Sequence, residues 1–176
     1  MMSVSGIPFQ KLRAAGGIFA AAVLTLTLSG CQKQVQTGAA YKMGERVEVG
    51  GLIYTVLESD WRSQLGEGAS AQVPKHRFLL IKLTVTNTGG QQRDIPLLHI
   101  ENTKKEQFME LAEVKDLSGW MGMIRLMAPS GIEEGWIVFD APPGNYNLRV
   151  VSREGEDEVA RYVEVPLTLK DDPLKM

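Results

Sequence analysis

Apolar and polar residues alternate in short runs along most of the chain after residue 40. The clearest run is residues 78–86, in which aliphatic residues occupy every second position and lysine or threonine lies between several of them. A period of two is typical of a strand with one buried face. The run ends at residues 87–90, Asn-Thr-Gly-Gly, which is a turn sequence. The pattern therefore predicts a β-strand bounded by a tight turn.

Six further segments show similar runs, and turn residues separate them. Residues 46–49 and 52–57 flank a Gly-Gly pair and predict a hairpin. The other strands are expected at residues 95–100, 135–141, 146–152 and 159–165, with weaker ones at 107–111 and 123–127. Evidence for helix is confined to residues 106–114, where we expect one or two turns at most. Short strands at this spacing predict an all-β sandwich or barrel.

The chain begins with a different pattern. Lys11 and Arg13, with no acidic residue nearby, lead into an apolar run over residues 14–28, the layout of a secretory signal peptide. This run is shorter than the roughly 20 residues that a membrane-spanning helix needs, so a cleaved signal is the preferred interpretation. Residues 32–40 that follow are polar and small and predict a flexible tether.

The junction between these segments reads Leu28-Ser29-Gly30-Cys31 and resembles the lipobox of bacterial lipoproteins. The resemblance implies cleavage between Gly30 and Cys31 and attachment of a diacylglyceryl group, usually with a third acyl chain, to Cys31. At about 0.8 kcal/mol per buried methylene, such a group would hold the protein to a membrane almost permanently. The expected location is the outer face of the bacterial cytoplasmic membrane, or the outer membrane of a Gram-negative envelope.

These features divide the chain into four parts. We expect a signal peptide over residues 1–30, a lipidated N-terminus and tether over 31–40, a β-sandwich over 41–169 and a short tail over 170–176. Cys31 is the only cysteine, so an intramolecular disulfide and a multi-cysteine metal site are excluded. Loss of the signal removes two basic residues and no acid, so the net charge changes from -2 to -4. This acidity argues against nucleic-acid binding and leaves the lipid as the membrane contact.

The folded part resembles the domain of unknown function DUF4352. The residues that carry this resemblance are Gly50-Gly51-Leu52 before Tyr54-Thr55-Val56, the strand ending in Thr86-Asn87-Thr88-Gly89, and Gly135-Trp136-Ile137-Val138 through Pro142, after Pro129-Ser130-Gly131. The resemblance covers roughly residues 41–165 and implies a telokin-like, immunoglobulin-like antiparallel β-sandwich of about seven to nine strands. It brings no catalytic residues and no cofactor.

The residues that remain point to binding rather than catalysis. Neither His76 nor His99 lies in a nucleophile motif, and no nucleotide-binding glycine pattern occurs, so we expect a protein that is not an enzyme. Trp61 and Trp120 fall in loop-like stretches and are candidate contacts for a protein partner of the cell envelope, with packing in the core as the alternative. The loops at residues 64–74 and 119–122 are the expected binding surfaces, because sandwich loops gather at the two ends.

An alternative function is copper binding. His99, Met109, Met121 and Met123, with Met127 further along, occur within a short stretch of the chain. Imidazole and thioether ligands together favour Cu(I). Methionine is also a common filler of hydrophobic cores, so a core role for these residues stays open. The sequence therefore leaves two hypotheses, an interaction module of the envelope and a Cu(I) carrier.

Overall fold

A computed structural model describes residues 40–154 and 157–168 of the chain. The predicted signal peptide, the lipobox with Cys31, nearly all of the tether and the C-terminal tail lie outside these residues. The described part contains ten strands: β1 (Arg46–Val49), β2 (Leu52–Arg62), β3 (Arg77–Asn87), β4 (Arg93–Asp94), β5 (His99–Asn102), β6 (Gln107–Met109), β7 (Leu126–Met127), β8 (Ile132–Ala141), β9 (Tyr146–Glu154) and β10 (Asp157–Val165).

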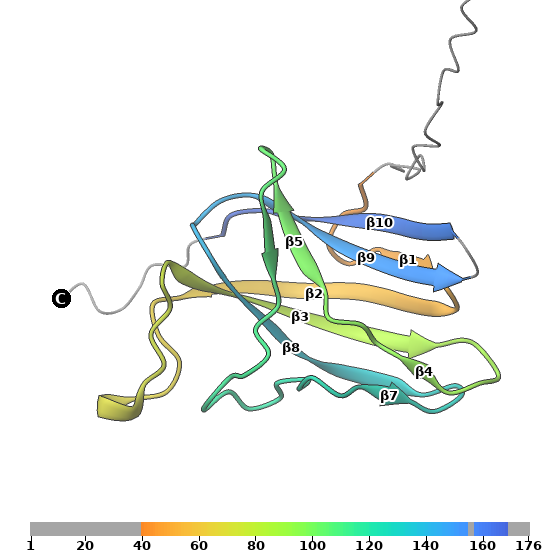
Figure 1. The fold of residues 1–176 in the computed structure, drawn as a ribbon, viewed down its shortest axis with the longest axis horizontal. Helices are drawn as coiled ribbons and strands as arrows, with labels where there is room; N and C mark the ends of the chain where they lie inside the picture. The colour runs from red at the N-terminus through yellow and green to blue at the C-terminus, as the bar shows by residue number, and fades with distance from the viewer. Residues whose placement is uncertain (1–39, 155–156, 169–176) are drawn as a thin grey trace, which may run out of the picture. The chain divides into compact units, whose positions relative to one another are not determined.

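The strands form two four-stranded antiparallel sheets that enclose one hydrophobic core (Figure 1). One sheet has the order β1-β2-β3-β8 and the other has the order β10-β9-β5-β6. The short strands β4 and β7 pair with each other as a separate two-stranded sheet. This architecture confirms the predicted all-β antiparallel sandwich. The described residues hold ten strands rather than seven to nine, because the two-residue strand β4, which the sequence did not predict, pairs with β7, which lies within the weaker strand expected at residues 123–127.

The central strand β3 shows how the alternating pattern builds the core. Leu79, Ile81, Leu83 and Val85 are fully buried between the two sheets, as the period of two predicts. On the opposite face of β3, Phe78 and Leu80 are also buried. They belong to a second, smaller hydrophobic cluster, whose other buried members are Leu65, Val114 and Val138. The outer face of this sheet is therefore covered at one end by connecting segments.

A β-bulge in β2 reverses which residues face the core. The pairing with β3 shifts between Val56 and Glu58, so Leu57 is an extra residue in the strand. Before the bulge the even-numbered residues are buried, and after it Ser59 and Trp61 are buried. The sequence predicted Trp61 in a loop-like stretch, as a partner contact or, alternatively, as a core residue. The core alternative is correct, because Trp61 lies in β2 and the bulge turns its indole into the core, where its ring centroid lies 6.1 Å from that of Tyr146.

Two other local expectations are corrected by the structure. Of the two alternatives for residues 106–114, the weaker strand at 107–111 is confirmed in part as β6 and the helical turns are wrong, because Phe108 packs edge-on against Tyr146 while its neighbours on either side face outward. The strand expected at residues 95–100 begins only at His99. A single short 3-10 helix, Gly68–Ser70, is the only helix in the described part of the chain. The described part of the chain contains no helix long and apolar enough to cross a membrane.

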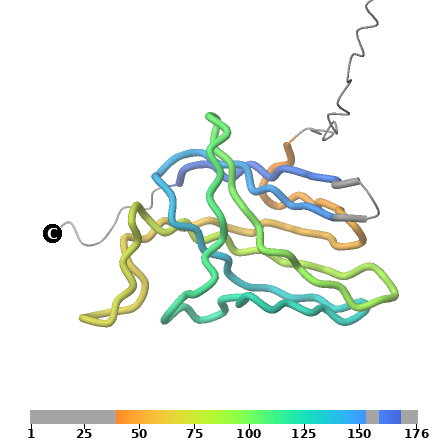
Figure 2. The backbone as a smooth tube through the Cα atoms, viewed as in Figure 1, coloured from red at the N-terminus to blue at the C-terminus, as the bar shows by residue number. Residues whose placement is uncertain are grey.

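The connection between β6 and β7 runs along the free edge of β8 (Figure 2). Trp120 pairs with Trp136 in a parallel bridge, and the amide of Met121 donates to the Trp136 carbonyl at 3.0 Å. Gly135 makes this approach possible, because a Cβ there would lie 2.7 Å from the Gly119 carbonyl oxygen. The segment therefore covers an edge that would otherwise expose unpaired backbone groups.

Candidate functional site

The two tryptophans predicted as partner contacts are not on the surface. Trp61 is 6% exposed and belongs to the main core. Trp120 is partly buried against the second cluster, and its indole Nε1 is fully covered. Trp61 is therefore a core residue and not a partner contact, and Trp120 keeps only part of its surface accessible. The predicted loop at residues 119–122 nevertheless leads directly into the surface described below.

The residues of the predicted copper site are mostly separated. His99 and Met109 face each other across β5 and β6. Met121 packs against the core beside Gly135, and Met127 is buried. Met123 is exposed in the connection before β7. In residues 40–154 and 157–168 no group of three or more histidine, cysteine or carboxylate side chains is placed to hold a metal ion.

A buried ion pair, which the sequence did not suggest, organises this region. The guanidinium of Arg125 binds a carboxylate oxygen of Glu110, and both side chains are almost completely buried. The second carboxylate oxygen accepts a hydrogen bond from the Leu98 amide at 3.1 Å. The Arg125 Nε donates to the Gly122 carbonyl at 2.6 Å. Burial raises the pKa of Glu110, and the charge of Arg125 opposes that rise.

The inward position of Arg125 leaves its neighbours on the surface. Ile124 is 86% exposed, and Met123 and Leu126 are each about half exposed. The only charged residue of this stretch is therefore hidden, and large apolar side chains face solvent on either side of it. We call residues 123–126 the apolar loop. Exposed apolar clusters of this kind are common at protein interaction sites.

A cleft of about 610 Å³ lies next to the apolar loop. It opens where β5 separates from β9: β9 pairs with β10 along its whole length but with β5 only over residues 146–149. The chain before β5 instead donates its Ile95 amide to the Arg125 carbonyl. Pro96 lacks an amide hydrogen and could not donate a ladder hydrogen bond to β9 at its position. Asp94 lines the cleft and pairs with Leu126, so the cleft and the apolar loop are adjacent.

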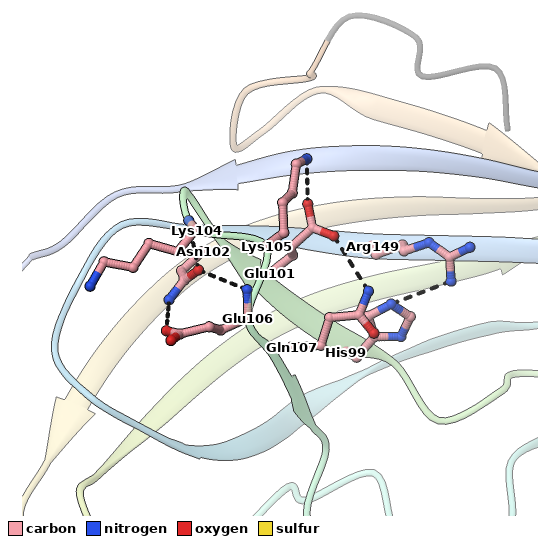
Figure 3. Close-up of polar contacts among 8 residues, drawn as sticks. All are labelled: His99, Glu101, Asn102, Lys104, Lys105, Glu106, Gln107 and Arg149. Carbon is pink, nitrogen blue, oxygen red and sulfur yellow. Dashed lines mark hydrogen bonds and ion pairs between the residues drawn. The ribbon is translucent and has the colours of Figure 1, made fainter.

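The polar residues of β5, β6 and β9 form one layer on the outer face of their sheet (Figure 3). The Nη1 of Arg149 lies 3.3 Å from the Nε2 of His99, and both side chains line the cleft. Glu101 accepts from the Lys105 ammonium at 2.7 Å and from the Gln107 amide at 3.4 Å. The cleft wall is thus fixed by a network of cross-strand contacts.

This network also shifts the pKa of its acid. The hydrogen bond from Lys105 lowers the pKa of Glu101, and partial burial opposes the effect. The same contact raises the pKa of Lys105. In the hairpin turn, Asn102 binds the Glu106 carboxylate through its amide nitrogen at 2.6 Å and accepts the Glu106 and Lys104 amides through its carbonyl oxygen. The β5–β6 hairpin is therefore held by charge-assisted contacts at its tip.

The sequence matches one family model, "Domain of unknown function (DUF4352)", over residues 41–158. The match spans most of the chain and nearly all of the sandwich. The protein is thus a β-sandwich protein, and it belongs to the DUF4352 family, as the sequence resemblance indicated. No functionally curated protein has a sequence that matches this chain.

Several solved structures share the fold. The yjhA protein from Bacillus subtilis is 16% identical, with a TM-score of 0.56 over 71% of this chain and 98% of its own. A functionally unknown protein from Listeria monocytogenes EGD-e is 7% identical, with a TM-score of 0.52 over 73% of this chain and 85% of its own. The secreted protein MPT63 from Mycobacterium tuberculosis is 12% identical, with a TM-score of 0.51 over 74% and 98%. Identities this low indicate a common fold and nothing about shared activity.

Proposed function

We propose that this protein is a lipid-anchored, extracytoplasmic binding module of the bacterial cell envelope. Its sandwich holds a partner protein, and it catalyses no reaction. The apolar loop, residues 123–126, is the surface at which the partner docks. The observation that carries this proposal is that Arg125 is buried while its sequence neighbour Ile124 is exposed.

The energetics of the apolar loop favour a binding role. Ile124 is 86% exposed. Full burial of an aliphatic side chain is worth roughly 1.5 to 3 kcal/mol, which the folded chain alone does not gain here. The ion pair with Glu110 fixes the adjacent Arg125, so the loop is held in place before a partner arrives. A preformed surface loses less conformational entropy on binding than a flexible one.

The anchor is supported by the residues Leu28-Ser29-Gly30-Cys31 and by the fold shared with the secreted protein MPT63. Residues 32–40 between the lipid and the sandwich would span roughly 15 to 18 Å as a flexible chain. The chain enters the sandwich at Tyr41, which pairs with β10 at the edge of one sheet. The segment that leads to the apolar loop lies along β8 at the edge of the other sheet. This arrangement would leave the apolar loop accessible to an envelope protein.

The histidines support a non-catalytic role. The Nδ1 of His76 lies 3.3 Å from Asp140, whose carboxylate also accepts the backbone amides of Lys75 and His76. This contact fixes the chain where it enters β3. His99 is bound to Arg149, so a nearby positive charge would oppose a metal cation at its ring nitrogen. Of the predicted Cu(I) ligands, only Met109 lies opposite His99 on the neighbouring strand.

Two measurements test the proposal. Cys31→Ser should abolish acylation and leave an uncleaved precursor, and a variant that is processed and fractionates like the wild type would contradict the anchor. Ile124→Asp should reduce recovery of the partner with the protein from solubilised membranes at least tenfold. Val73→Asp is the comparison, because Val73 is another strongly exposed aliphatic residue and lies in residues 64–74, the other loop that the sequence predicts as a binding surface. Equal recovery with both variants would exclude the apolar loop as the docking surface.

A further inference from the structure

The cleft lies beside the part of β9 that β5 does not pair with. Beyond Arg149, no strand of the described chain pairs with β9 on the side where β5 departs. Val151 and Ser152 line the cleft at this position. Leu98, which lies between the cleft-lining Leu97 and His99, bonds to Glu110 and not to β9: its carbonyl accepts the Glu110 amide, and its amide donates to the Glu110 carboxylate. An extended peptide in the cleft would therefore meet a free strand edge, the arrangement used in β-strand addition.

The floor of the cleft is apolar. Val49 and Leu52, which belong to the other sheet, line it from below where β5 no longer covers them. Leu97 and Met109 add apolar surface at the sides. Side chains of an extended peptide point alternately to opposite faces. One set would reach this floor, and the other set would point toward the rim.

The rim carries excess positive charge although the exported domain is expected to be acidic. Arg93 and Arg149 line it, with Asp94 as the single acidic residue. Arg93 lies tightly over Gly51, because a Cβ there would be 2.9 Å from its guanidinium carbon. Arg149 is positioned by His99. A guanidinium has five donors and can bind several acceptors at once, including a carboxylate.

We infer that the cleft binds an extended peptide segment of the partner, with apolar residues alternating with polar ones and an acidic side chain at the rim. The segment would add to β9 and place its acid against Arg93 and Arg149. This inference rests on the proposed function, since it names the chemistry of the partner segment that lies next to the apolar loop. A peptide is favoured over a small carboxylate because the cleft combines a strand edge with apolar lining residues from both sheets.

The experiment uses the full-length protein in detergent and a library of acetylated, amidated hexapeptides with random sequence. The expected result is enrichment of peptides that alternate apolar residues with an aspartate or glutamate at one fixed position. Binding of the enriched peptide should slow amide hydrogen exchange in the segment of β9 that lines the cleft. Enrichment without an acidic position, or without protection of β9, would overturn the inference.

Two variants test the rim. Arg149→Met should weaken binding of the enriched peptide about tenfold, whereas Arg62→Met, an exposed arginine of the other sheet, should leave it unchanged. Met109→Glu should weaken binding by a similar factor, because Met109 is exposed at the rim and the new carboxylate would repel the acid. Its control is Val73→Glu. Equal affinities for Met109→Glu and its control would overturn the inference even if Arg149→Met failed to fold.

The two proposals fail in different ways. Recovery of a partner that depends on Ile124, together with no peptide enrichment by the library, would remove the peptide site and leave the docking surface. Enrichment of acidic peptides that depends on Arg149, without any partner whose recovery depends on Ile124, would remove the docking surface and leave the peptide site. Binding of free fatty acids or acetate in place of peptides, with no protection of β9, would show that the cleft recognises a small carboxylate and would overturn the peptide inference.

Discussion

Glu110 and Arg125 form an ion pair in the protein interior, with side chains 0% and 1% exposed. This one contact shapes both parts of the proposed binding surface. Through Arg125 it removes the only charge from the apolar loop, and through Glu110 it holds the backbone of Leu98, whose neighbours Leu97 and His99 line the cleft. The Glu110–Arg125 pair, which is not part of the alternating pattern of the strands, therefore determines which side chains of the apolar loop are exposed.

Breaking this pair should be severely destabilising. Arg125→Met leaves an uncompensated buried carboxylate, and we expect a loss of about 3 to 5 kcal/mol in the free energy of unfolding. The double variant Glu110→Leu with Arg125→Met should lose less than the single variant, because no buried charge remains. Urea unfolding of the full-length protein provides the measurement. Surface ion pairs contribute at most about 1 kcal/mol to stability. If the unfolding free energy of Arg125→Met lay within about 1 kcal/mol of the wild-type value, the pair would not be buried.

Gly135→Ala should lower stability because of the backbone that lies against it. The added methyl group would lie 2.7 Å from the Gly119 carbonyl oxygen and 2.5 Å from the Met121 Cγ. We expect a loss of about 1 to 3 kcal/mol, the usual range for overpacking, measured by urea unfolding. Gly90→Ala is the control, since nothing lies within 4 Å of a Cβ at that position. Equal stability of the two variants would mean that the segment does not pack on β8.

Trp61 should behave as a core residue. Trp61→Ala removes an indole that is 6% exposed and packs near Tyr146, and we expect a loss of about 3 to 5 kcal/mol. Ile124→Ala, at an exposed position, should change stability by no more than about 0.5 kcal/mol. Thermal unfolding of both variants distinguishes the two environments. If Trp61→Ala left the unfolding temperature unchanged, Trp61 would be a surface residue.

Glu101 should make the stability depend on pH in the acidic range. Its pKa is lowered in the folded state by Lys105, so folding is favoured when the carboxylate is ionised. That contribution is complete above the ordinary glutamate pKa of about 4.3 and is lost as the pH falls through the lower, folded value. The stability difference between wild type and Glu101→Gln should therefore shrink on acidification below about pH 4. A difference that is constant with pH would refute the assignment.

The alternating pattern predicted most of the strands because each residue of a half-buried strand faces either core or solvent. It failed at Trp61 because one inserted residue, Leu57, changes the facing of every residue after it. Nothing in the local composition of β2 marks that insertion. At residues 106–114 the helix-forming composition predicted one or two helical turns beside a weaker strand at 107–111, and the packing of Phe108 against Tyr146 favours the strand.

The candidate site was less predictable than the fold. The sequence pointed to the loop at residues 119–122 but selected its tryptophan, whose side chain is partly buried against the second hydrophobic cluster. Arg125 determines which side chains of the apolar loop are exposed. Arginine is usually a surface residue, and only the tertiary contact with Glu110 shows that Arg125 is buried. The cleft likewise depends on the position at which β5 leaves β9, which Pro96 signals only in part.

The most direct test of the binding role is site-specific photocrosslinking in intact envelopes. A photoreactive amino acid is placed at position 124 in the apolar loop and, as a control, at position 73, where the side chain is also exposed. We predict one discrete crosslinked protein from position 124 that is absent from position 73 and is lost in the Arg125→Met background. Identical products from both positions, or no product from position 124, would contradict the assignment of the apolar loop as a docking surface.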